Sequence, residues 1–357
     1  MQRFCDSMKA IVFHGKGDVR VDSVPDATMT APTDAIVRVV NAAICGSDLW
    51  FYRGQSVAWK PGDRTGHEFL GVIEETGSAV TGFRKGQMVA APFAFSDGSC
   101  DYCLDDALYT SCRHGGFWGG NDNDGGQGQF VRVPFADATL VEIPESIRHD
   151  AKKRTSALAL TDVMGTGHHG NVRAGTKAGS TVAVIGDGAV GLCGVLSAAY
   201  LGAERIIAIG HHADRLEIAK KFGATDVIDS KDPDAAQKII DMTNGGVKHV
   251  VEAVGSQATI DFGVSICRPG GNVAYVGIPV GVEKLDFRRL FGSNISVGGA
   301  LAPVRRYLPE FMEAVGSGRL DPSPVFNLRM PLESAPEGYA AMDGRTAIKV
   351  CLEISAP

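Results

Sequence analysis

The feature that most constrains this chain is the stretch Thr181–Gly210, which reads TVAVIGDGAVGLCGVLSAAYLGAERIIAIG. Its β-branched beginning, Thr181–Ile185, predicts a buried strand, and Arg205–Ile209 predicts a second strand. Between them, the small apolar segment Ala189–Leu201 predicts a closely packed helix that stops at Gly202. Three glycines stand at G-x-G-x-x-G spacing between the first strand and the helix: Gly186, Gly188 and Gly191. The stretch therefore predicts a strand, a tight turn, a helix and a second strand in succession.

Each glycine has a physical task in such a unit. The first permits the tight turn, the second lets the backbone approach a pyrophosphate, and the third lets the helix pack against the sheet. The N-terminus of the helix adds free N–H groups and a partial positive charge. We therefore predict that a dinucleotide binds here, through Gly186, Gly188, Ala189, Val190 and Gly191. The alternative is a glycine-rich packing turn that binds no ligand.

The pattern of the chain changes near residue 157. Before it, short predicted strands such as Lys9–Phe13 and Ala35–Val40 are separated by glycine and polar turns, which is typical of a small β-barrel-like domain. After it, strands alternate with helices, which predicts a doubly wound parallel sheet. Six strands are predicted there: Thr181–Ile185, Arg205–Ile209, Asp226–Ile228, His249–Glu252, Asn272–Val276 and Ile295–Val297.

The predicted fold class is therefore α/β, with a β-barrel domain and a doubly wound parallel-sheet domain. We place the first part of the β-barrel domain at residues 8–157 and the sheet domain at residues 158–303. Beyond it the pattern is a helix, a loop and a last strand, so residues 304–357 are expected to return to the first domain. Residues 1–7 are expected to be an extension.

Composition and charge argue against several classes of function. The 357 residues are 44% hydrophobic and 21% charged, which is typical of a globular protein of about two domains. A formal net charge of -6 gives no sign of a nucleic-acid-binding surface. The longest apolar stretch is too short to span a bilayer, and the N-terminus lacks a signal-peptide pattern. We therefore expect a cytoplasmic protein that binds neither nucleic acid nor membranes, with its eight cysteines as reduced thiols or metal ligands.

Three separated positions carry side chains suited to a metal ion. Cys45 ends a predicted strand, His67 and Glu68 follow Gly66, and Asp162 precedes the first strand of the doubly wound sheet. Cysteine, histidine and carboxylate are suitable zinc ligands, and a catalytic zinc takes three of them with one position open. None is specific by itself, because a lone cysteine is usually packed in a core. Their combination with a dinucleotide fold favours a catalytic zinc site.

The sequence resembles the zinc-dependent alcohol dehydrogenases of the medium-chain dehydrogenase/reductase superfamily. The resemblance covers nearly the whole chain from Met8. Besides the glycine motif, it is carried by Cys45-Gly46-Ser47-Asp48, Gly66-His67-Glu68, Gly71, Gly77 and Val80. It implies a GroES-like β-barrel catalytic domain, a Rossmann domain and an active site in the cleft between them. It also implies assembly as a homodimer or homotetramer.

The resemblance implies a ligand set for the catalytic zinc. Cys45 would be the thiolate ligand and His67 the imidazole ligand. Asp162 falls where many relatives have a cysteine and some have an aspartate. Glu68 would be a nearby or alternating ligand, or would instead support the other ligands through hydrogen bonds.

The resemblance also assigns the proton path and the substrate pocket. Ser47 would relay the substrate proton, and Asp48 would orient His67. Some relatives continue the relay through a histidine at the position of Trp50, and an indole cannot do this, so Trp50 is assigned to the wall of the pocket. Four aromatic residues suggest an apolar or aromatic substrate: Trp50, Phe93, Phe117 and Trp118.

Further residues are expected near the cofactor. Thr166 matches a threonine that lies beside the nicotinamide in the family. Lys349 falls where the family often has a basic contact to the pyrophosphate, although it could equally be a solvated surface lysine. His168 and His169 are adjacent, so we interpret them as a helix-start turn rather than a metal pair. The ends of the later predicted strands should surround the ring, with Ala253, Val254, Val276 and Gly277.

The end of the second predicted strand bears on the choice of cofactor. A domain specific for NAD carries an Asp or Glu there to accept a hydrogen bond from the ribose 2′-OH, and here the residue is Gly210. His211, His212 and Arg215 follow and could donate hydrogen bonds to a 2′-phosphate. We expect Asp214 to be occupied as the cap of the next helix. The sequence therefore predicts a preference for NADP(H), the alternative being a solvated loop that accepts both cofactors.

A second cysteine cluster lies in a glycine-rich excursion. Many relatives bind a structural zinc there with four cysteines, whereas this chain has Cys100, Cys103 and Cys112, with Asp106 in the slot of a cysteine. Asp106, Asp97 or His114 could supply a fourth ligand. Because a cysteine is missing, we favour a lobe that has lost its metal.

The function predicted is a zinc-dependent alcohol dehydrogenase, or an aldehyde or ketone reductase, that acts on a small molecule. A polyol or amino-alcohol dehydrogenase of the same branch is an alternative. A zinc-free quinone or enone reductase is disfavoured by Cys45, His67 and Asp162 together. A non-catalytic cofactor sensor is disfavoured by Ser47, since a sensor needs no proton relay.

Overall fold

The structure is a computed structural model that describes residues 7–55, 59–105, 107–120, 123–299 and 301–357. The chain divides into two units. Unit 1 consists of the residues up to Asp162 together with Pro303–Pro357, and unit 2 is Val163–Ala302. The borders lie within a few residues of the predicted ones, but they place Asp162 with the first unit, whereas we expected it at the start of the sheet domain.

Unit 2 is built on a six-stranded parallel sheet in the order β12-β11-β10-β13-β14-β15. This order corresponds to 3-2-1-4-5-6 along the chain, which is the Rossmann arrangement. All six predicted strands are present, with ends that differ by a few residues. Their bounds are β10 Thr181–Ile185, β11 Arg205–Gly210, β12 Asp226–Asp229, β13 Val247–Glu252, β14 Cys267–Tyr275 and β15 Ser296–Gly299.

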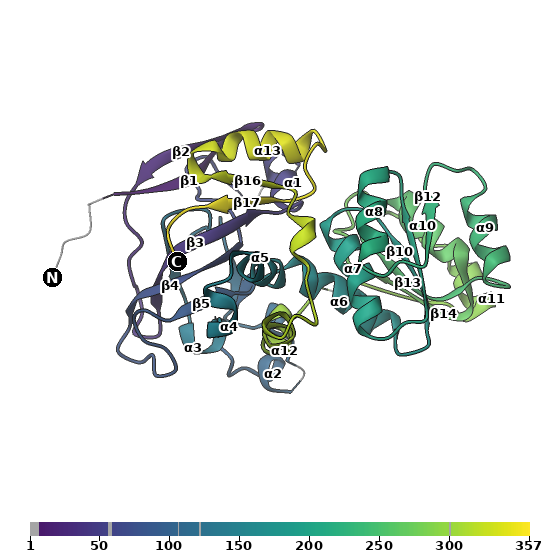
Figure 1. Ribbon diagram of the computed structural model, residues 1–357, viewed down its shortest axis with the longest axis horizontal. Helices are drawn as coiled ribbons and strands as arrows, with labels where there is room; N and C mark the ends of the chain where they lie inside the picture. Colours follow the sequence, from purple (N-terminus) through teal and green to yellow (C-terminus); the bar gives the residue numbers. More distant parts are fainter. Residues whose placement is uncertain (1–6, 56–58, 106, 121–122, 300) are drawn as a thin grey trace. The chain divides into compact units, whose positions relative to one another are not determined.

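Helices cover both faces of this sheet (Figure 1). A Cβ on Gly194 of α7 would lie 3.2 Å from Val184, and a Cβ on Gly263 of α10 would lie 3.2 Å from Ile185. Because neighbouring residues of a strand point to opposite faces, α7 and α10 lie on opposite sides. The helices of unit 2 are α6 Val163–Ala174, α7 Ala189–Tyr200, α8 Ala213–Lys221, α9 Ala235–Met242, α10 Gln257–Ile266 and α11 Phe287–Ser293.

Unit 1 is built on a seven-stranded sheet in the order β16-β17-β3-β4-β5-β9, with β8 also paired to β3. The C-terminal segment of the chain supplies β16 and β17, and Val350 of β17 pairs with Ile44 at the end of β3. The strands are β1 Met8–Gly15, β2 Asp18–Val24, β3 Ala35–Ile44, β4 Glu68–Thr76, β5 Met88–Ala91, β6 Ala94–Phe95, β7 Gly116–Phe117, β8 Phe130–Val133, β9 Val141–Glu142, β16 Leu328–Pro331 and β17 Val350–Glu353.

Helices connect the strands of unit 1 (Figure 1). They are α1 Asp48–Tyr52, α2 Asp101–Leu104, α3 Ala136–Thr139, α4 Glu145–Arg148, α5 Ala151–Leu160, α12 Val304–Gly316 and α13 Ala335–Asp343. The core between them is apolar and includes Phe69, Trp118 and Tyr339. Among the described residues, no helix is both long enough and apolar enough to cross a membrane. The predicted α/β fold class, with a β domain and a Rossmann domain, is confirmed.

Candidate active site

Four potential metal ligands of unit 1 converge on one point. They are the residues that the sequence singled out, namely Cys45, His67, Glu68 and Asp162, and their ligand atoms all lie within 4.8 Å of one another. Asp162 Oδ2 lies 3.3 Å from Cys45 Sγ and 3.2 Å from His67 Nε2. A tetrahedral zinc ion with bonds of about 2.0–2.3 Å needs its ligand atoms roughly 3.3–3.7 Å apart. The donor set and its spacing therefore fit zinc.

The backbone delivers these ligands from three separate places in unit 1. Cys45 follows β3, His67 precedes β4, and Asp162 comes just after α5. Gly66 has φ +88°, a conformation that side-chain-bearing residues rarely adopt, and a Cβ there would lie 2.3 Å from Gln127 Cγ. Glycine at this position therefore makes the turn before His67 and leaves room for Gln127.

Asp48 fixes the imidazole ring of His67. Asp48 is buried, and its Oδ1 lies 3.1 Å from His67 Nδ1. Its Oδ2 accepts a hydrogen bond of 3.0 Å from the backbone N–H of Cys45. One carboxylate thus links two candidate ligands and leaves Nε2 of His67 facing Asp162. This geometry suits the orienting role expected of Asp48.

Two residues that the sequence analysis missed hold Asp48 in place. The buried Gln127 donates from Nε2 to Asp48 Oδ2 at 3.2 Å and to the carbonyl of Ala43 at 2.8 Å. Its Oε1 accepts hydrogen bonds from Tyr339 Oη at 2.7 Å and from Thr65 Oγ1 at 2.6 Å. Gln127 stands in a glycine-rich segment and Tyr339 more than two hundred residues later, so no local pattern connects them to the site.

Burial and mutual charge shift the protonation of the cluster. Burial, together with the carboxylates of Asp162 and Glu68, raises the pKa of the Cys45 thiol to about 11. Burial by itself would lower the pKa of His67, but the charge of Asp48, the nearby Cys45 and hydrogen bonds with Asp162 and Asp48 together outweigh it and raise this pKa well above its usual value. Metal ions bind thiolate and neutral imidazole, so metal binding here releases protons and strengthens as pH rises.

Only one of the two carboxylate oxygens of Glu68 has a hydrogen-bond partner among the described residues. Its Oε1 accepts a hydrogen bond of 2.5 Å from Lys349 Nζ, and both side chains are buried. Its Oε2 is buried and has no hydrogen-bond partner among the described residues. A buried carboxylate oxygen without a partner is costly, and a cation would satisfy it. This is a second observation that fits a metal ion at this point.

The same pair corrects the role predicted for Lys349. We expected this residue to contact the pyrophosphate or to be solvated. Instead, its side chain is 1% exposed, and besides Glu68 its Nζ reaches the carbonyl of Ile44 at 3.4 Å and lies 5.7 Å from the centre of the Phe326 ring. Lys349 stands next to β17, which pairs with β3, and so its side chain enters the interior of unit 1 behind the ligands. It is an internal counter-ion.

The remaining predicted residues of unit 1 fall into two groups. Ser47 Oγ lies 3.3 Å from His67 Nε2, so its hydroxyl lies beside the metal-binding point. The ring of Phe93 packs edge-on against His67, and the ring of Phe117 is stacked on that of Phe93. Trp118 does not belong with them, because it packs on Phe69 and Phe95 in the core of unit 1. Trp50 is half-buried in α1.

The cysteine lobe forms a second four-donor cluster. Asp97, Cys100, Cys103 and Cys112 bring their ligand atoms within 4.8 Å of one another. Asp97 Oδ1 lies 3.2 Å from Cys112 Sγ and 3.6 Å from Cys103 Sγ. Its other oxygen, Oδ2, is bound to Nδ1 of His114 at 2.6 Å. Asp106, which we considered as a fourth ligand, lies outside the described residues.

This geometry removes the reason for expecting a lobe without metal. Three of the four donors follow the spacing Asp97-x-x-Cys100-x-x-Cys103, so the carboxylate stands first in the series, and Asp97 is one of the fourth ligands that we considered. Burial would raise the pKa of Asp97, but hydrogen bonds from His114 and from backbone N–H groups outweigh it and lower this pKa. Asp97 is therefore an anion at neutral pH, as a metal ligand must be.

In unit 2 the glycine-rich turn has the expected shape. Gly186 has φ +114°, and a Cβ on Gly191 would lie 1.9 Å from the carbonyl oxygen of Gly186, so only glycine allows the helix to start this close. Gly188 is the N-cap of α7, and a Cβ there would contact nothing within 4 Å. The first turn of α7, with Ala189 and Val190, therefore begins at an open face that can receive a phosphate.

The second residue of this turn, Asp187, overturns a premise of the cofactor prediction. We expected no carboxylate at the end of the second strand. The Asp187 carboxylate lies there, and its Oδ2 accepts hydrogen bonds from the backbone N–H groups of His211 at 2.8 Å and His212 at 2.9 Å. Arg215 is buried, with Nη1 3.8 Å from Asp187 Oδ1. His212 and Arg215 are thus engaged by an internal anion.

Two further expectations for unit 2, the cap of α8 and the position of the adjacent histidines, are wrong. Asp214 is not the cap of α8, whose N-cap is His212 without a side-chain hydrogen bond. His168 and His169 lie in the middle of α6 and are buried, not in a helix-start turn. Thr166 belongs to the same helix. The residues expected around the ring follow directly after β13 and β14: Ala253, Val254, Val276 and Gly277.

Comparison with known proteins agrees with this architecture. A family model described as alcohol dehydrogenase GroES-like domain matches residues 31–145, and a zinc-binding dehydrogenase model matches residues 189–317. An alcohol dehydrogenase of Cupriavidus necator is 36% identical over 337 residues, which cover 88% of this chain and 89% of that protein. This chain belongs to the zinc-dependent alcohol dehydrogenase family of the medium-chain dehydrogenase/reductases.

Solved members of the family have the same fold. The alcohol dehydrogenase from Thermus sp. ATN1 is 34% identical, with a TM-score of 0.91 over 98% of this chain and 100% of that chain. A zinc-binding dehydrogenase from Sinorhizobium meliloti, solved with NADP bound, is 27% identical, with a TM-score of 0.85 over 97% of this chain and 99% of that one. In the chain described here, the GroES-like match covers Cys45, His67 and Glu68, whereas Asp162 lies between the two matched segments.

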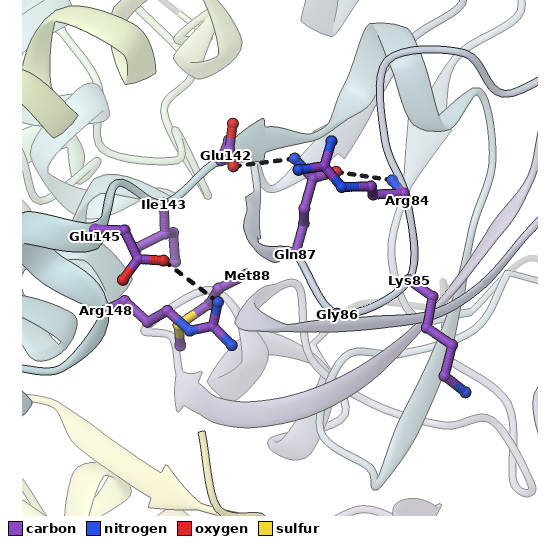
Figure 2. A pocket seen from close by; sticks show the side chains of 9 residues that line it. All are labelled: Arg84, Lys85, Gly86, Gln87, Met88, Glu142, Ile143, Glu145 and Arg148. Atoms are coloured by element: carbon purple, nitrogen blue, oxygen red, sulfur yellow. Dashed lines mark hydrogen bonds and ion pairs between the residues drawn. The ribbon is translucent and has the colours of Figure 1, made fainter.

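A surface pocket of the alcohol dehydrogenase lies in unit 1 and contains none of these residues (Figure 2). Two pairs of its polar side chains contact each other: Gln87 Nε2 donates to Glu142 Oε1 at 3.0 Å, and Arg148 Nη1 lies 3.5 Å from Glu145 Oε1. It offers no unpaired buried group, so we do not assign it to the site. Its lining is Arg84, Lys85, Gly86, Gln87, Met88, Glu142, Ile143, Glu145 and Arg148.

Proposed function

We propose that this alcohol dehydrogenase interconverts a small alcohol and its aldehyde or ketone, with a catalytic zinc in unit 1 and a nicotinamide cofactor on unit 2. The convergence of Cys45, His67 and Asp162 on one point carries the proposal. The buried, unpartnered Oε2 of Glu68 beside them supports a cation there. A quinone or enone reductase without zinc has no use for such a cluster.

The zinc would be held by Cys45, His67 and Asp162, with Glu68 as a nearby or alternating ligand. When bound, zinc acts as a Lewis acid on the substrate oxygen, and the nicotinamide accepts or supplies the hydride. Asp48 keeps Nδ1 of His67 occupied, so Nε2 is the atom presented to the metal.

Ser47 would move the substrate proton. Its Oγ lies 3.3 Å from the ligand atom of His67, and a hydroxyl can accept one proton while it donates its own. Trp50 cannot continue such a path, since an indole donates only. We propose that the proton passes from Ser47 to a cofactor hydroxyl or to water.

For the cofactor, we propose contacts from the turn Gly186–Gly191 and from Thr166, Ala253, Val254, Val276 and Gly277. The sequence by itself predicted a preference for NADP(H) over NAD(H). The absence of a side chain at Gly210 and the NADP-bound relative favour it, and the carboxylate of Asp187 opposes it.

The substrate is proposed to be apolar or aromatic, because Phe93 packs against His67 and Phe117 stacks on Phe93. Polyols are the alternative. A homodimeric or homotetrameric assembly and a cytoplasmic location remain proposals.

The test is a panel of aliphatic, aromatic and polyhydroxy alcohols, followed by the absorbance of the reduced nicotinamide, with and without a chelator. Turnover of simple alcohols that is lost on chelation and regained with Zn²⁺ supports the proposal. Reduction of quinones or enones that is insensitive to chelation would replace it.

A further inference from the structure

Asp187, the second residue of the glycine-rich turn, reaches across to the end of β11. It is 8% exposed, and both of its carboxylate oxygens are engaged there. Oδ2 accepts hydrogen bonds from the N–H groups of His211 and His212, and Nδ1 of His212 lies 3.1 Å from Oδ1 and 3.0 Å from Oδ2. Two consecutive backbone N–H groups that converge on one atom form an anion-binding concavity. In this chain, the anion in it is the protein's own carboxylate.

Gly210 shows how closely this carboxylate occupies the end of β11. A Cβ built on Gly210 would lie 2.5 Å from both Oδ2 and Cβ of Asp187. No side chain therefore fits at this position while Asp187 stays in place. The carboxylate stands where the side chain of a strand-end Asp or Glu would begin, so negative charge is present at this place although the strand ends in glycine.

The charge of Asp187 is fixed by its surroundings. Burial would raise its pKa, but the N–H groups of His212 and His211 outweigh burial and lower the pKa below its usual value. The carboxylate is therefore ionised at neutral pH. The cationic Arg215 and the ring of His212 are drawn to it, which removes two of the groups expected to bind a 2′-phosphate.

We propose that Asp187 is a specificity-determining residue that occupies the anion-binding concavity at the end of β11 and makes the domain select NAD(H) over NADP(H). A 2′-phosphate would have to displace this carboxylate or lie beside it, and two anions a few ångströms apart repel strongly in a partly buried site. A ribose 2′-OH meets no such penalty. An ionised carboxylate has about four acceptor positions, so Oδ1 retains room for a hydroxyl donor.

This inference rests on the proposed use of a nicotinamide cofactor and is tested by binding, without turnover. Isothermal titration of the full chain with NAD⁺ and NADP⁺ gives the ratio of dissociation constants. We expect the wild-type protein to bind NAD⁺ at least about tenfold more tightly. In Asp187→Asn, the amide oxygen can still accept the two N–H groups while the charge is gone. We expect that variant to lose at least about tenfold of the discrimination, mainly through tighter binding of NADP⁺.

Asp214→Asn is the matched control. Asp214 is exposed in the first turn of α8, close in sequence to His211 and His212, and Asp214→Asn removes the same charge outside the buried concavity. The ratio of dissociation constants of this variant should therefore stay within about threefold of wild type. If Asp187→Asn does not fold, as judged by its melting curve, Asp187→Ser opens the concavity instead and should gain NADP⁺ binding.

Each other outcome contradicts one of the two proposals. Wild-type protein that binds NADP⁺ as tightly as NAD⁺, or more tightly, overturns the inference alone. An Asp187 variant whose ratio of dissociation constants for NAD⁺ and NADP⁺ equals that of wild type overturns it as well. Wild-type protein that binds neither dinucleotide overturns the proposed function, and the inference with it.

Discussion

Lys349 Nζ lies 2.5 Å from Glu68 Oε1, in the interior of unit 1 and directly behind the candidate zinc ligands. The lysine is 1% exposed and the glutamate 0%, so water screens neither charge. Burial lowers the pKa of Lys349, but the charge of Glu68 outweighs it and raises the pKa above its ordinary value. Burial raises the pKa of Glu68 and the charge of Lys349 opposes this rise, so the charged form of each residue depends on the other.

Removal of one member of this pair should destabilise unit 1. Lys349→Met leaves the carboxylate of Glu68 buried and uncompensated, which costs about 3–5 kcal/mol. Urea unfolding at neutral pH, followed by circular dichroism, measures this loss. The double variant Lys349→Met with Glu68→Leu should regain most of it, because two apolar side chains leave no charge unpaired.

Lys9→Met is the control for this prediction. Lys9 also pairs with a glutamate, Glu333, at 3.0 Å, but the two side chains are 51% and 58% exposed. Its loss should cost less than about 1 kcal/mol. A Lys349→Met protein of normal stability with weakened dinucleotide binding would instead restore the role at the pyrophosphate that the sequence suggested.

The candidate catalytic zinc gives a second prediction. Cys45→Ser should remove one metal ion per chain and nearly all turnover, because the remaining donors lack the thiolate that zinc prefers. Metal analysis by mass spectrometry and an alcohol oxidation assay measure both. Cys267→Ser removes a buried cysteine from unit 2 and should retain both the metal and the activity. Full activity of a rigorously metal-free preparation would refute the zinc mechanism.

Much of the fold could be predicted because short local patterns of the sequence determine its strands and turns. The six strands of unit 2 are short β-branched runs at regular intervals, and the turn Gly186–Gly191 marks the first of them. The ligands Cys45, His67 and Asp162 could be predicted by resemblance to a family. The support that Gln127 and Tyr339 give to Asp48 could not, because these two residues come from distant segments that only the fold brings together.

The errors share one physical cause, which is that a side chain acts where its atoms lie and not where its residue stands in the sequence. We searched for a carboxylate at the end of β11 and found Gly210, but the carboxylate arrives from Asp187, on the neighbouring strand's turn. A Gly210→Asp substitution, which would place a carboxylate at the strand end to favour NAD(H), would bring its side chain into collision with Asp187. Lys349 was expected to contact the pyrophosphate or to be solvated, whereas its ammonium group is bound to Glu68 inside unit 1.

The cysteine lobe gives a third prediction. With Asp97 as fourth donor, it should bind a second zinc ion. Cys103→Ser should lower the zinc content by one ion per chain and should reduce the melting temperature, because metal binding stabilises the folded lobe. Activity per remaining catalytic zinc should be retained in the variant, since no candidate catalytic residue belongs to the lobe. One zinc per wild-type chain, unaffected by Cys103→Ser, would instead support a lobe without metal.

The fourth prediction concerns stability in acid and begins with His168, which is buried in α6 with Nδ1 2.9 Å from Ser197 Oγ. Burial lowers the pKa of His168 to about 4. In the unfolded chain its pKa is about 6.5, so between these values the unfolded state binds a proton that the folded state does not. This contribution to stability is therefore present above pH 6.5 and is lost as pH falls towards 4.

The expected loss from His168 between pH 7 and pH 5 is about 2 kcal/mol of unfolding free energy. The His168→Gln variant carries no group at this position that can be protonated. Between pH 7 and pH 5 its unfolding free energy should therefore fall by about 2 kcal/mol less than that of the wild-type protein. Urea unfolding at the two pH values measures the difference. His149→Gln is the control, because the side chain of His149 is 77% exposed and its replacement should leave the pH dependence unchanged. If His168→Gln and wild type lose equal stability between pH 7 and pH 5, His168 does not stay neutral in the folded protein, and burial in α6 is not what sets its charge.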